Sequence, residues 1–405
     1  MINYHAFFNQ QLQALKTEGR YRTFANLERQ VGCAPYALWH KPNGETKSVV
    51  VWCSNDYLSM SHHPDVIQAF QDAATLYGVG SGGTRNISGT ARLHVKLEQT
   101  LADLHDKESA LVFTSGYTAN EASLSALGEG LPDCVFFSDE KNHASMIQGI
   151  RHSRAEKFVF RHNDMDDLRQ KLASVDPRRP KVIAFVSLYS MDGDIAPLKQ
   201  ICDLAKEFNA LTYLDEVHAV GIYGPKGNGL AAEQGLLDRI DIIQGNFAKA
   251  YGVVGGYITG SKALVDFVRS HASGFIFTTS LPPAIAAAAL KSIEVLKADP
   301  SYRQRLRQNA DYLKNALRKT QLNFIDSPSH IVPVVVGDAH LCQEVATRLL
   351  NDFQIYAQPI NYPTVPKGQE RLRLTVTPAH TKEMIDQLVE ALDIIETQEN
   401  SKQAA

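Results

Sequence analysis

The sequence predicts an α/β protein with a large, mostly parallel sheet and a smaller C-terminal α+β domain. Short β-branched or aromatic runs alternate with helix-like segments from about residue 64, which is typical of βαβ units with helices on both faces of a sheet. Near residue 297 the alternation gives way to fewer strands and longer helices. We expect an N-terminal helix and extension (1–48), a large α/β domain (49–296) and a small C-terminal domain (297–405).

The individual elements follow from local patterns. Phe8, Leu12 and Leu15 have helical spacing and predict a helix near residues 4–18 that ends before Gly19. A second helix ends at Gly78. Six apolar runs then predict strands: SALVFTSGY, DCVFFSDEKNH, KFVFRHND, PKVIAFVSLYS, ALTYLDEVHA and IDIIQGN. The last part predicts strands in HIVPVVVG and RLRLTVT, helices near 339–353 and 381–396, and a frayed end in QENSKQAA.

Composition narrows the class of protein. Of the 405 residues, 44% are hydrophobic and 21% are charged, so the chain has enough apolar residues to fold. The net charge of −3 lacks the basic excess that a nucleic-acid partner requires. No apolar run reaches the roughly 18 residues of a membrane-spanning helix, and no secretory signal is visible. The five cysteines form no CxxC pair, so we expect a reduced, cytoplasmic protein without a structural metal.

Polar residues that follow neighbouring strands carry the candidate chemistry. Asp215 ends one apolar run, with His218 three residues on, and Lys249 follows the next run. Ligands of open parallel sheets bind at the carboxyl ends of the strands. The alternatives are ordinary: the aspartate caps a helix, and the lysine is a surface residue. Against the latter, Lys249 precedes the apolar, glycine-rich segment AYGVVGGY.

A carboxylate and a lysine in this arrangement suit pyridoxal phosphate. The carboxylate keeps the pyridine nitrogen protonated, and the lysine holds the aldehyde as a Schiff base and later acts as a base. The segment 113–120 places Gly116 between a strand and a helix, where backbone N–H groups bind phosphate well. His143 follows another strand and could stack on the cofactor ring, although a loop histidine is often only a polar surface residue.

Gly78, Gly80 and Gly83 fit the dinucleotide pattern GxGxxG. They follow a helix-like segment and no strand leads into them, so we reject a nicotinamide or flavin site. The stretch instead resembles a loop in which the backbone approaches a ligand closely.

Together these motifs resemble the α-oxoamine synthases, pyridoxal-phosphate enzymes of fold type I with the aspartate-aminotransferase fold. The resemblance covers about residues 3–397 and rests on NDYL (55–58), GSGGTRNISGT (80–90), NHASMI (142–147), YSMDGD (189–194), DEVHAVGIYGP (215–225), KAYGVVGGY (249–257) and FIFTTSLPP (275–283). EGRYRTF, GGTRN and PINYPTVPKGQERLRLT make the chain most similar to the 5-aminolevulinate synthases.

The resemblance implies condensation of glycine with succinyl-CoA to 5-aminolevulinate, CoA and carbon dioxide through a quinonoid. Lys249 would hold the cofactor and remove the glycine Cα proton, while Asp215 would keep the ring nitrogen charged. His218 would hydrogen-bond the ring oxygen or the condensing carbonyl, and His143 would stack on the ring. The other implied cofactor contacts are Tyr57, Ser115, Gly116, Tyr117, Ser190, Asn246, and Thr278 with Thr279 from the neighbouring subunit of a homodimer.

The resemblance also implies the substrate contacts. Arg373 would grip the glycine carboxylate, and Asn55 would be another substrate contact. The alternative is a solvent-facing strand arginine, which would put both arginines of RLRL on one exposed face. Arg22 and Thr364 would bind the distal succinyl carboxylate and so penalise uncharged acyl groups. The remaining implied contacts are Thr84, which would crowd the glycine Cα, Asn86 beside the acyl chain, and Ser138 and Lys157 at CoA.

Three positions depart from the family pattern: Asn246 stands where threonine is common, Ala248 where glycine is common, and Val186 where an acidic residue is frequent. None removes a group that the chemistry needs. The product could feed tetrapyrrole (haem) synthesis or a secondary metabolite. The alternatives are another glycine-using synthase, similar to 2-amino-3-ketobutyrate CoA ligase, and a non-catalytic partner subunit, against which the presence of Lys249 argues.

Overall fold

The computed structural model describes residues 2–404 and divides the chain into two compact units. Unit 1 comprises residues 1–57, 190–194 and 304–405, and unit 2 comprises residues 58–189 and 195–303. This division differs from the three expected segments, because residues 1–48 share a unit with the C-terminal segment.

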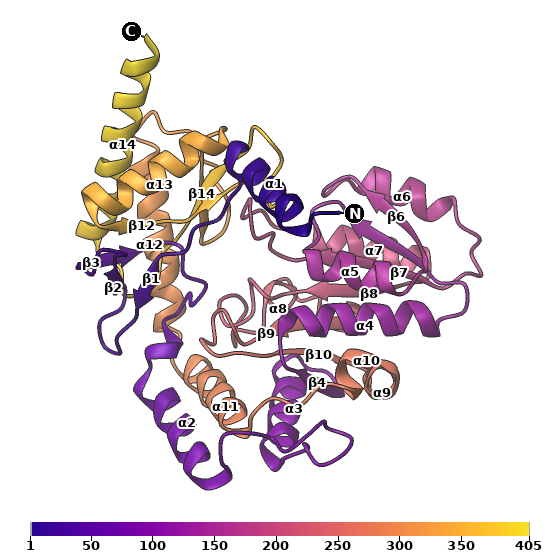
Figure 1. The fold of residues 1–405 in the computed structure, drawn as a ribbon. Helices are drawn as coiled ribbons and strands as arrows, with labels where there is room; N and C mark the ends of the chain where they lie inside the picture. The colour runs from indigo at the N-terminus through magenta and orange to yellow at the C-terminus, as the bar shows by residue number, and fades with distance from the viewer. Residues whose placement is uncertain (1, 405) are drawn as a thin grey trace. The chain divides into compact units, whose positions relative to one another are not determined.

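Unit 2 is an α/β structure built on one seven-stranded sheet (Figure 1). Its strands are β4 (Ser109–Phe113), β5 (Val135–Asp139), β6 (Glu156–Phe160), β7 (Lys181–Val186), β8 (Ala210–Asp215), β9 (Ile242–Asn246) and β10 (Gly256–Gly260). Its helices are η1 (Met60–His62), α2 (Pro64–Tyr77), α3 (Arg92–Leu104), α4 (Gly116–Gly130), α5 (Ala144–His152), α6 (Met165–Ala173), α7 (Leu198–Glu207), α8 (Leu230–Glu233), η2 (Leu237–Arg239), α9 (Lys262–His271), α10 (Ser273–Ile276) and α11 (Pro283–Ala298).

The strand order of this sheet is β4-β10-β9-β8-β7-β5-β6. The pairs β5–β6, β5–β7, β7–β8 and β8–β9 are parallel, whereas β10 runs antiparallel to both β4 and β9. The predicted α/β class with a mostly parallel sheet is therefore confirmed. Because β8 and β9 are adjacent and parallel, their carboxyl ends meet at one edge of the sheet.

The central strands of this sheet form the core of unit 2. Every residue of β5, β7, β9 and β10 is buried, as expected for strands covered on both faces. Even Lys181, at the start of β7, is buried, and its Nζ donates to the carbonyl oxygens of Asp176, Pro177 and Arg179. Helix α4 packs against β9 and β10 and against α5, which fixes the start of α4 near the end of β9 (Figure 1).

Unit 1 is the α+β part of the molecule. It has a four-stranded sheet of order β1-β2-β3-β12 and a three-stranded sheet of order β11-β14-β13. The strands are β1 (Asn26–Glu28), β2 (Tyr36–His40), β3 (Thr46–Val51), β11 (Ile331–Val335), β12 (Ile355–Tyr356), β13 (Pro359–Ile360) and β14 (Arg371–Thr375). The helices are α1 (Tyr4–Thr17), α13 (Ala339–Phe353), α14 (Lys382–Ala404) and most of α12 (Ser301–Leu317).

Helix α14 is longer than the sequence indicates. It continues through residues 398–404, which the sequence predicts as frayed, up to the last described residue. The reason is a contact that sequence pattern does not reveal: Arg348 of α13 donates from Nη1 to Glu399 Oε1 at 3.0 Å, and Glu399 is buried. Among the described residues, no helix combines the length and the hydropathy that crossing a bilayer requires.

Candidate active site

Asp215 lies at the carboxyl end of β8 and is almost completely buried. Its Oδ2 accepts a hydrogen bond from Asn120 Nδ2 at 2.8 Å, and its Oδ1 accepts one from the backbone N–H of Val217 at 2.9 Å. Both bonds favour the charged carboxylate, which offsets part of the cost of its burial. Two donors therefore hold the Asp215 carboxyl group in one orientation in the interior of unit 2.

Asn120 connects Asp215 to its surroundings. This buried residue of α4 accepts a hydrogen bond from the Tyr213 hydroxyl at 3.0 Å and donates a second one to Ser145 Oγ at 3.0 Å. Burial and the nearby Asp215 carboxylate raise the pKa of Tyr213 well above its usual value, so the phenol keeps its proton and stays a donor. Sequence reasoning missed Asn120; the signal was a polar residue on the helix face that also carries Gly116, four residues earlier.

His143 precedes α5 and continues this network. Its Nδ1 lies 2.7 Å from Ser145 Oγ and accepts from the backbone N–H of Ser145 at 3.3 Å. Partial desolvation of the ring lowers the pKa of His143, Asp215 opposes this shift, and Lys249 adds to it. The structure thus brings His143, Asp215 and Lys249 within electrostatic range of one another.

Lys249 lies in the connection between β9 and β10. The strands β9 and β10 are antiparallel, and two backbone hydrogen bonds join the ends of the loop between them. Phe247 N donates to Gly255 O and Val253 N donates to Phe247 O, both at 2.9 Å. Lys249 is half-buried, and Asp215 pairs in register with Gln244 of the adjacent β9. His218 lies in the buried turn that follows β8.

The start of α4 has the form of a phosphate cradle. Ser115 caps the helix, and its Oγ accepts from Thr118 N at 3.0 Å. A Cβ added to Gly116 would lie 2.9 Å from Asn246 Cβ, so only glycine lets the end of β9 approach this closely. Asn246 is buried, and its Oδ1 has no hydrogen-bond partner among the residues described. Tyr117 is half-exposed beside His143, at a ring-centroid distance of 6.4 Å.

Glu216 is a second buried carboxyl group, next to Asp215, that sequence reasoning missed. It accepts from Ser187 Oγ at 2.7 Å and from the backbone N–H groups of Leu230 and Ala231 at 3.1 and 2.8 Å. Burial outweighs these bonds and raises its pKa to about 7. The signal in the sequence was the pair of adjacent acidic residues, Asp215 and Glu216, that follows an apolar run.

In unit 1, both arginines of β14 are buried, which excludes the solvent-facing alternative. Arg371 donates to Asp192 Oδ1 at 2.5 Å and to two backbone oxygens. Arg373 donates from Nη1 to Asn55 Oδ1 at 3.1 Å and from Nη2 to the Tyr57 hydroxyl. Its Nε is buried without a hydrogen-bond partner among the described residues. Arg373 therefore retains a donor that faces no acceptor of the described chain.

Arg22 and Thr364 meet on an exposed part of unit 1. Arg22 Nη2 donates to Thr364 Oγ1 at 3.1 Å although the two residues are 342 positions apart in the chain. Ser190 is partly buried and also belongs to unit 1.

The glycine-rich segment 78–90 lies beside the predicted phosphate-contacting pair of unit 2. Thr84 forms an isolated antiparallel bridge with Thr279. Thr278 is half-buried, whereas Thr279 and Asn86 are exposed. No strand leads into this segment, in agreement with the rejection of a dinucleotide fingerprint.

The two predicted CoA contacts lie on the adjacent strands β5 and β6 and differ in exposure. Ser138 is buried in β5 and accepts from Asn142 Nδ2 at 2.9 Å, whereas Lys157 is exposed on the edge strand β6. Ser138 pairs in register with Val159, two residues beyond Lys157.

Of the departures from the family pattern, Val186 is buried and pairs with Asp215, and Ala248 is exposed.

Known proteins share this architecture and sequence. The profile of the aminotransferase class I and II family matches residues 47–392. 5-Aminolevulinate synthase 2 of Cereibacter sphaeroides is 55% identical over 391 residues, 96% of either chain. The 5-aminolevulinate synthase of Rhizobium meliloti is also 55% identical, and that of Rickettsia prowazekii is 51% identical over 97% of this chain and 94% of its own.

The chain belongs to the 5-aminolevulinate synthase family.

This family membership confirms the resemblance on which the site residues were chosen. A serine palmitoyltransferase of S. paucimobilis, solved with a PLP–myriocin adduct, has a TM-score of 0.90 and 31% identity, and the match covers 98% of this chain and 99% of the other. A further serine palmitoyltransferase structure with PLP also has a TM-score of 0.90, at 32% identity. 8-Amino-7-oxononanoate synthase from Francisella tularensis, at 24% identity and a TM-score of 0.72, shares the fold.

Proposed function

We propose that the protein condenses glycine with succinyl-CoA to give 5-aminolevulinate, CoA and carbon dioxide, with pyridoxal phosphate as its cofactor. The family membership supports the reaction, and the PLP-bound structural neighbours support the cofactor. When bound, pyridoxal phosphate would supply an electron-withdrawing ring that makes the glycine Cα–H bond acidic.

The residues of unit 2 fit this cofactor. The buried, doubly hydrogen-bonded Asp215 would hold a proton on the ring nitrogen. The start of α4 would take the phosphate, because its N–H groups have no partner within the helix. A phosphate there would also give the buried amide of Asn246 a partner, since rotation of the amide presents its NH₂ group. Asn therefore suits this position as well as the more common threonine.

Lys249 is the residue that we assign to proton transfer. Its Nζ would hold the cofactor aldehyde in the resting enzyme and would accept the proton from glycine Cα once the substrate is bound. A neutral His143 suits a stacking role, because the lowered pKa of His143 leaves its ring uncharged at neutral pH. His218 is assigned to the cofactor ring oxygen or the condensing carbonyl.

The burial of Arg373 is the observation that best supports an amino acid as the substrate. It is a permanent cation that donates to the neutral side chains of Asn55 and Tyr57, and its Nε has no partner among the described residues. A glycine carboxylate would supply the missing acceptor and the missing negative charge.

Arg22 and Thr364 are assigned to the distal carboxylate of the succinyl group. Their hydrogen bond places a cation and a hydroxyl side by side, although 342 positions separate the two residues in the chain. An uncharged acyl-CoA would leave Arg22 without this partner, which penalises such donors. Ser138 and Lys157 remain assigned to CoA, and Tyr57 and Ser190 to the cofactor site.

We further assign the protein to the cytoplasm and to homodimers in which Thr278 and Thr279 reach the phosphate of the neighbouring subunit. The exposed position of Thr279, and of Phe277 beside it, suits such a contact. The size of the assembly in solution, measured by light scattering, tests the dimer.

Product formation tests the main proposal. Purified protein with pyridoxal phosphate, glycine and succinyl-CoA should release one thiol for each 5-aminolevulinate formed, and it should turn over acetyl-CoA and octanoyl-CoA more slowly. Lys249→Ala should still bind the cofactor but should lose nearly all turnover. Preference for an uncharged acyl donor would favour another glycine-using synthase, and a wild-type protein without any turnover would favour a non-catalytic subunit.

A further inference from the structure

The backbone of the glycine-rich segment 78–90 is held by hydrogen bonds with one residue, Ser280. Its Oγ lies 2.9 Å from the carbonyl oxygen of Gly83 and 2.6 Å from that of Gly89. Its backbone N–H donates to Gly83 O at 3.0 Å, and its carbonyl oxygen accepts from Ser81 Oγ at 2.9 Å. Ser280 is buried, so water does not compete for these bonds.

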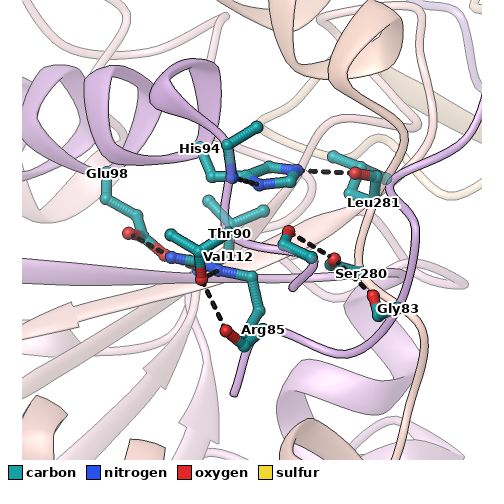
Figure 2. Close-up of polar contacts among 10 residues, drawn as sticks. Gly83, Arg85, Thr90, His94, Glu98, Val112, Ser280 and Leu281 are labelled. Atoms are coloured by element: carbon teal, nitrogen blue, oxygen red, sulfur yellow. Dashed lines mark hydrogen bonds and ion pairs between the residues drawn. The ribbon is translucent and has the colours of Figure 1, made fainter. Parts of the chain in front are cut away.

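A bidentate ion pair closes the same segment from the other side (Figure 2). Arg85 donates from Nη1 and Nη2 to the two carboxylate oxygens of Glu98 in α3, at 2.7 and 2.9 Å. Only 10% of the Arg85 side chain and 15% of the Glu98 side chain are exposed. Glu98 Oε1 also accepts from the backbone N–H of Val112 in β4, which ties the pair to the central sheet. We call Ser280, Arg85 and Glu98 the loop anchor.

His94 strengthens the same connection. Its Nδ1 accepts from Ala91 N at 3.0 Å, so its Nε2 carries the proton and donates to Leu281 O at 2.6 Å (Figure 2). Ser280 is therefore held against Gly83 of the segment, and Leu281 against the start of α3, which follows the segment.

Thr84 lies at the centre of this arrangement. It bridges Thr279, the residue before Ser280, and its carbonyl oxygen accepts from Gly89 N at 2.8 Å. Its Oγ1 is inaccessible to solvent and has no hydrogen-bond partner among the described residues. Thr279 and Gly89, which fix the backbone of Thr84, are thus a neighbour and a partner of the anchoring Ser280.

We propose that Ser280 and the Arg85–Glu98 pair are positioning residues that set the preference for glycine over larger amino acids, because they fix the backbone that carries Thr84. This inference rests on the proposed function and on the role that the family resemblance implies for Thr84, which would crowd the glycine Cα. A methyl group on the substrate is rejected only if Thr84 cannot move back, and close packing around a fixed backbone prevents that movement.

Gly89 offers a steric test with a matched control in the same loop. A Cβ added to Gly89 would lie 2.1 Å from Gly83 O and 2.3 Å from Ser280 Oγ, so Gly89→Ala must break the contact with Ser280. A Cβ added to Gly80 meets nothing within 4 Å, so Gly80→Ala leaves the contact with Ser280 intact and serves as the control for adding a methyl group to this loop. Neither glycine has a positive φ, so neither substitution adds backbone strain.

The experiment measures kcat/KM of the holoenzyme for glycine, L-alanine and L-serine at saturating succinyl-CoA. We expect Ser280→Ala, Gly89→Ala and Glu98→Gln each to lower the glycine-to-alanine ratio about fivefold or more. Saturating succinyl-CoA is used because Asn86 of the same segment is assigned to the acyl chain, so the KM for succinyl-CoA should rise as well. Ser280→Thr keeps the hydroxyl and should restore most of the ratio, and Thr84→Ser added to Ser280→Ala should lower it by less than the two separate effects combined.

An unchanged ratio in these variants, even with a lowered melting temperature, would show that the loop anchor is only structural and would overturn the inference. If Ser280→Ala and Gly89→Ala do not fold, Glu98→Gln decides, because it keeps an oxygen for Val112 N and removes only the charge. A wild-type protein that does not condense glycine with succinyl-CoA would instead overturn the proposed function.

Discussion

The end of β8 in unit 2 and strand β14 in unit 1 each bury two side chains of like charge. At the end of β8 these are Asp215 and Glu216, and in β14 they are Arg371 and Arg373. Glu216 receives hydrogen bonds from one side chain and two backbone groups, and Arg371 is paired with Asp192. Both of these residues are satisfied by the protein itself.

Their neighbours are bonded differently. Asp215 is held by Asn120 and Val217 and lies within electrostatic range of His143, while Arg373 has neutral side-chain partners and a buried Nε without a partner in the described chain. Burial alone therefore does not distinguish a structural charge from a binding charge. The distinguishing property is whether the fold itself supplies the counter-charge or the full set of hydrogen bonds.

The largest expected effect separates Asp215 from Glu216. Asp215→Asn should lower kcat about a thousandfold, because a neutral amide does not stabilise the protonated ring nitrogen. Glu216→Gln should keep kcat within about fivefold, since a carboxyl group with a pKa of about 7 is already partly protonated at neutral pH. Single-turnover rates of both variants check this. Equal losses would show that the two acids do not differ in role.

The next contrast lies in β14. Arg373→Leu should raise the KM for glycine about ten- to a hundredfold, because a charged hydrogen bond to its carboxylate is lost. Arg371→Leu should instead cost about 3–5 kcal/mol of stability, since it removes a buried ion pair with Asp192 and two bonds to backbone oxygens. Glycine titrations and chemical denaturation of both variants separate the roles. A raised KM in Arg371→Leu at unchanged stability would reverse the assignment.

Glu216 also predicts a pH dependence. Its folded pKa of about 7 lies above the ordinary 4.5, so between these values the folded state holds a proton that the unfolded chain has lost. Stability from this group is fully present below pH 4.5 and is lost as the pH rises through the folded pKa of about 7, by about 3 kcal/mol in all. Unfolding free energies of wild type and Glu216→Gln, measured at pH 5 and 7.5, should diverge in favour of the variant as the pH rises. A constant difference would contradict the raised pKa.

The smallest effect concerns the exposed Arg22. Arg22→Leu should raise the KM for succinyl-CoA about fivefold and narrow the gap to acetyl-CoA, because solvent weakens a surface charge compared with the buried Arg373. The KM for glycine should not change. An unchanged ranking of acyl donors would exclude Arg22 as the selector.

Much of the fold was predictable from sequence because apolar runs in a parallel sheet are short, continuous and bounded by turns. The run that ends at Asp215 and the one that precedes Lys249 correspond to β8 and β9. The antiparallel direction of β10 was not predicted, since a hairpin and a crossover differ in tertiary packing more than in local pattern. The length of α14 likewise depends on the remote Arg348.

Within the candidate site, the sequence predicted those residues whose side-chain type alone suggests a catalytic role. Asp215 and Lys249 stand out because a charged residue directly after an apolar run is close to the protein interior, where burying a charge is costly unless it has a partner or a function. Asn120 does not stand out, because its role arises from partners 25, 93 and 95 positions away in the chain. Likewise, the burial of Ser138 follows from its place in a central strand and not from its own chemistry.

The antiparallel hairpin of β9 and β10 affects the order of folding. Lys249 is placed by pairings that span roughly ten residues, whereas Asp215 reaches its amide partner across 95 positions. Short loops close at lower entropic cost than long ones. A refolding chain should therefore form the hairpin that carries Lys249 early and the contact between Asp215 and Asn120 late. Binding of pyridoxal phosphate should then report the last stage of folding.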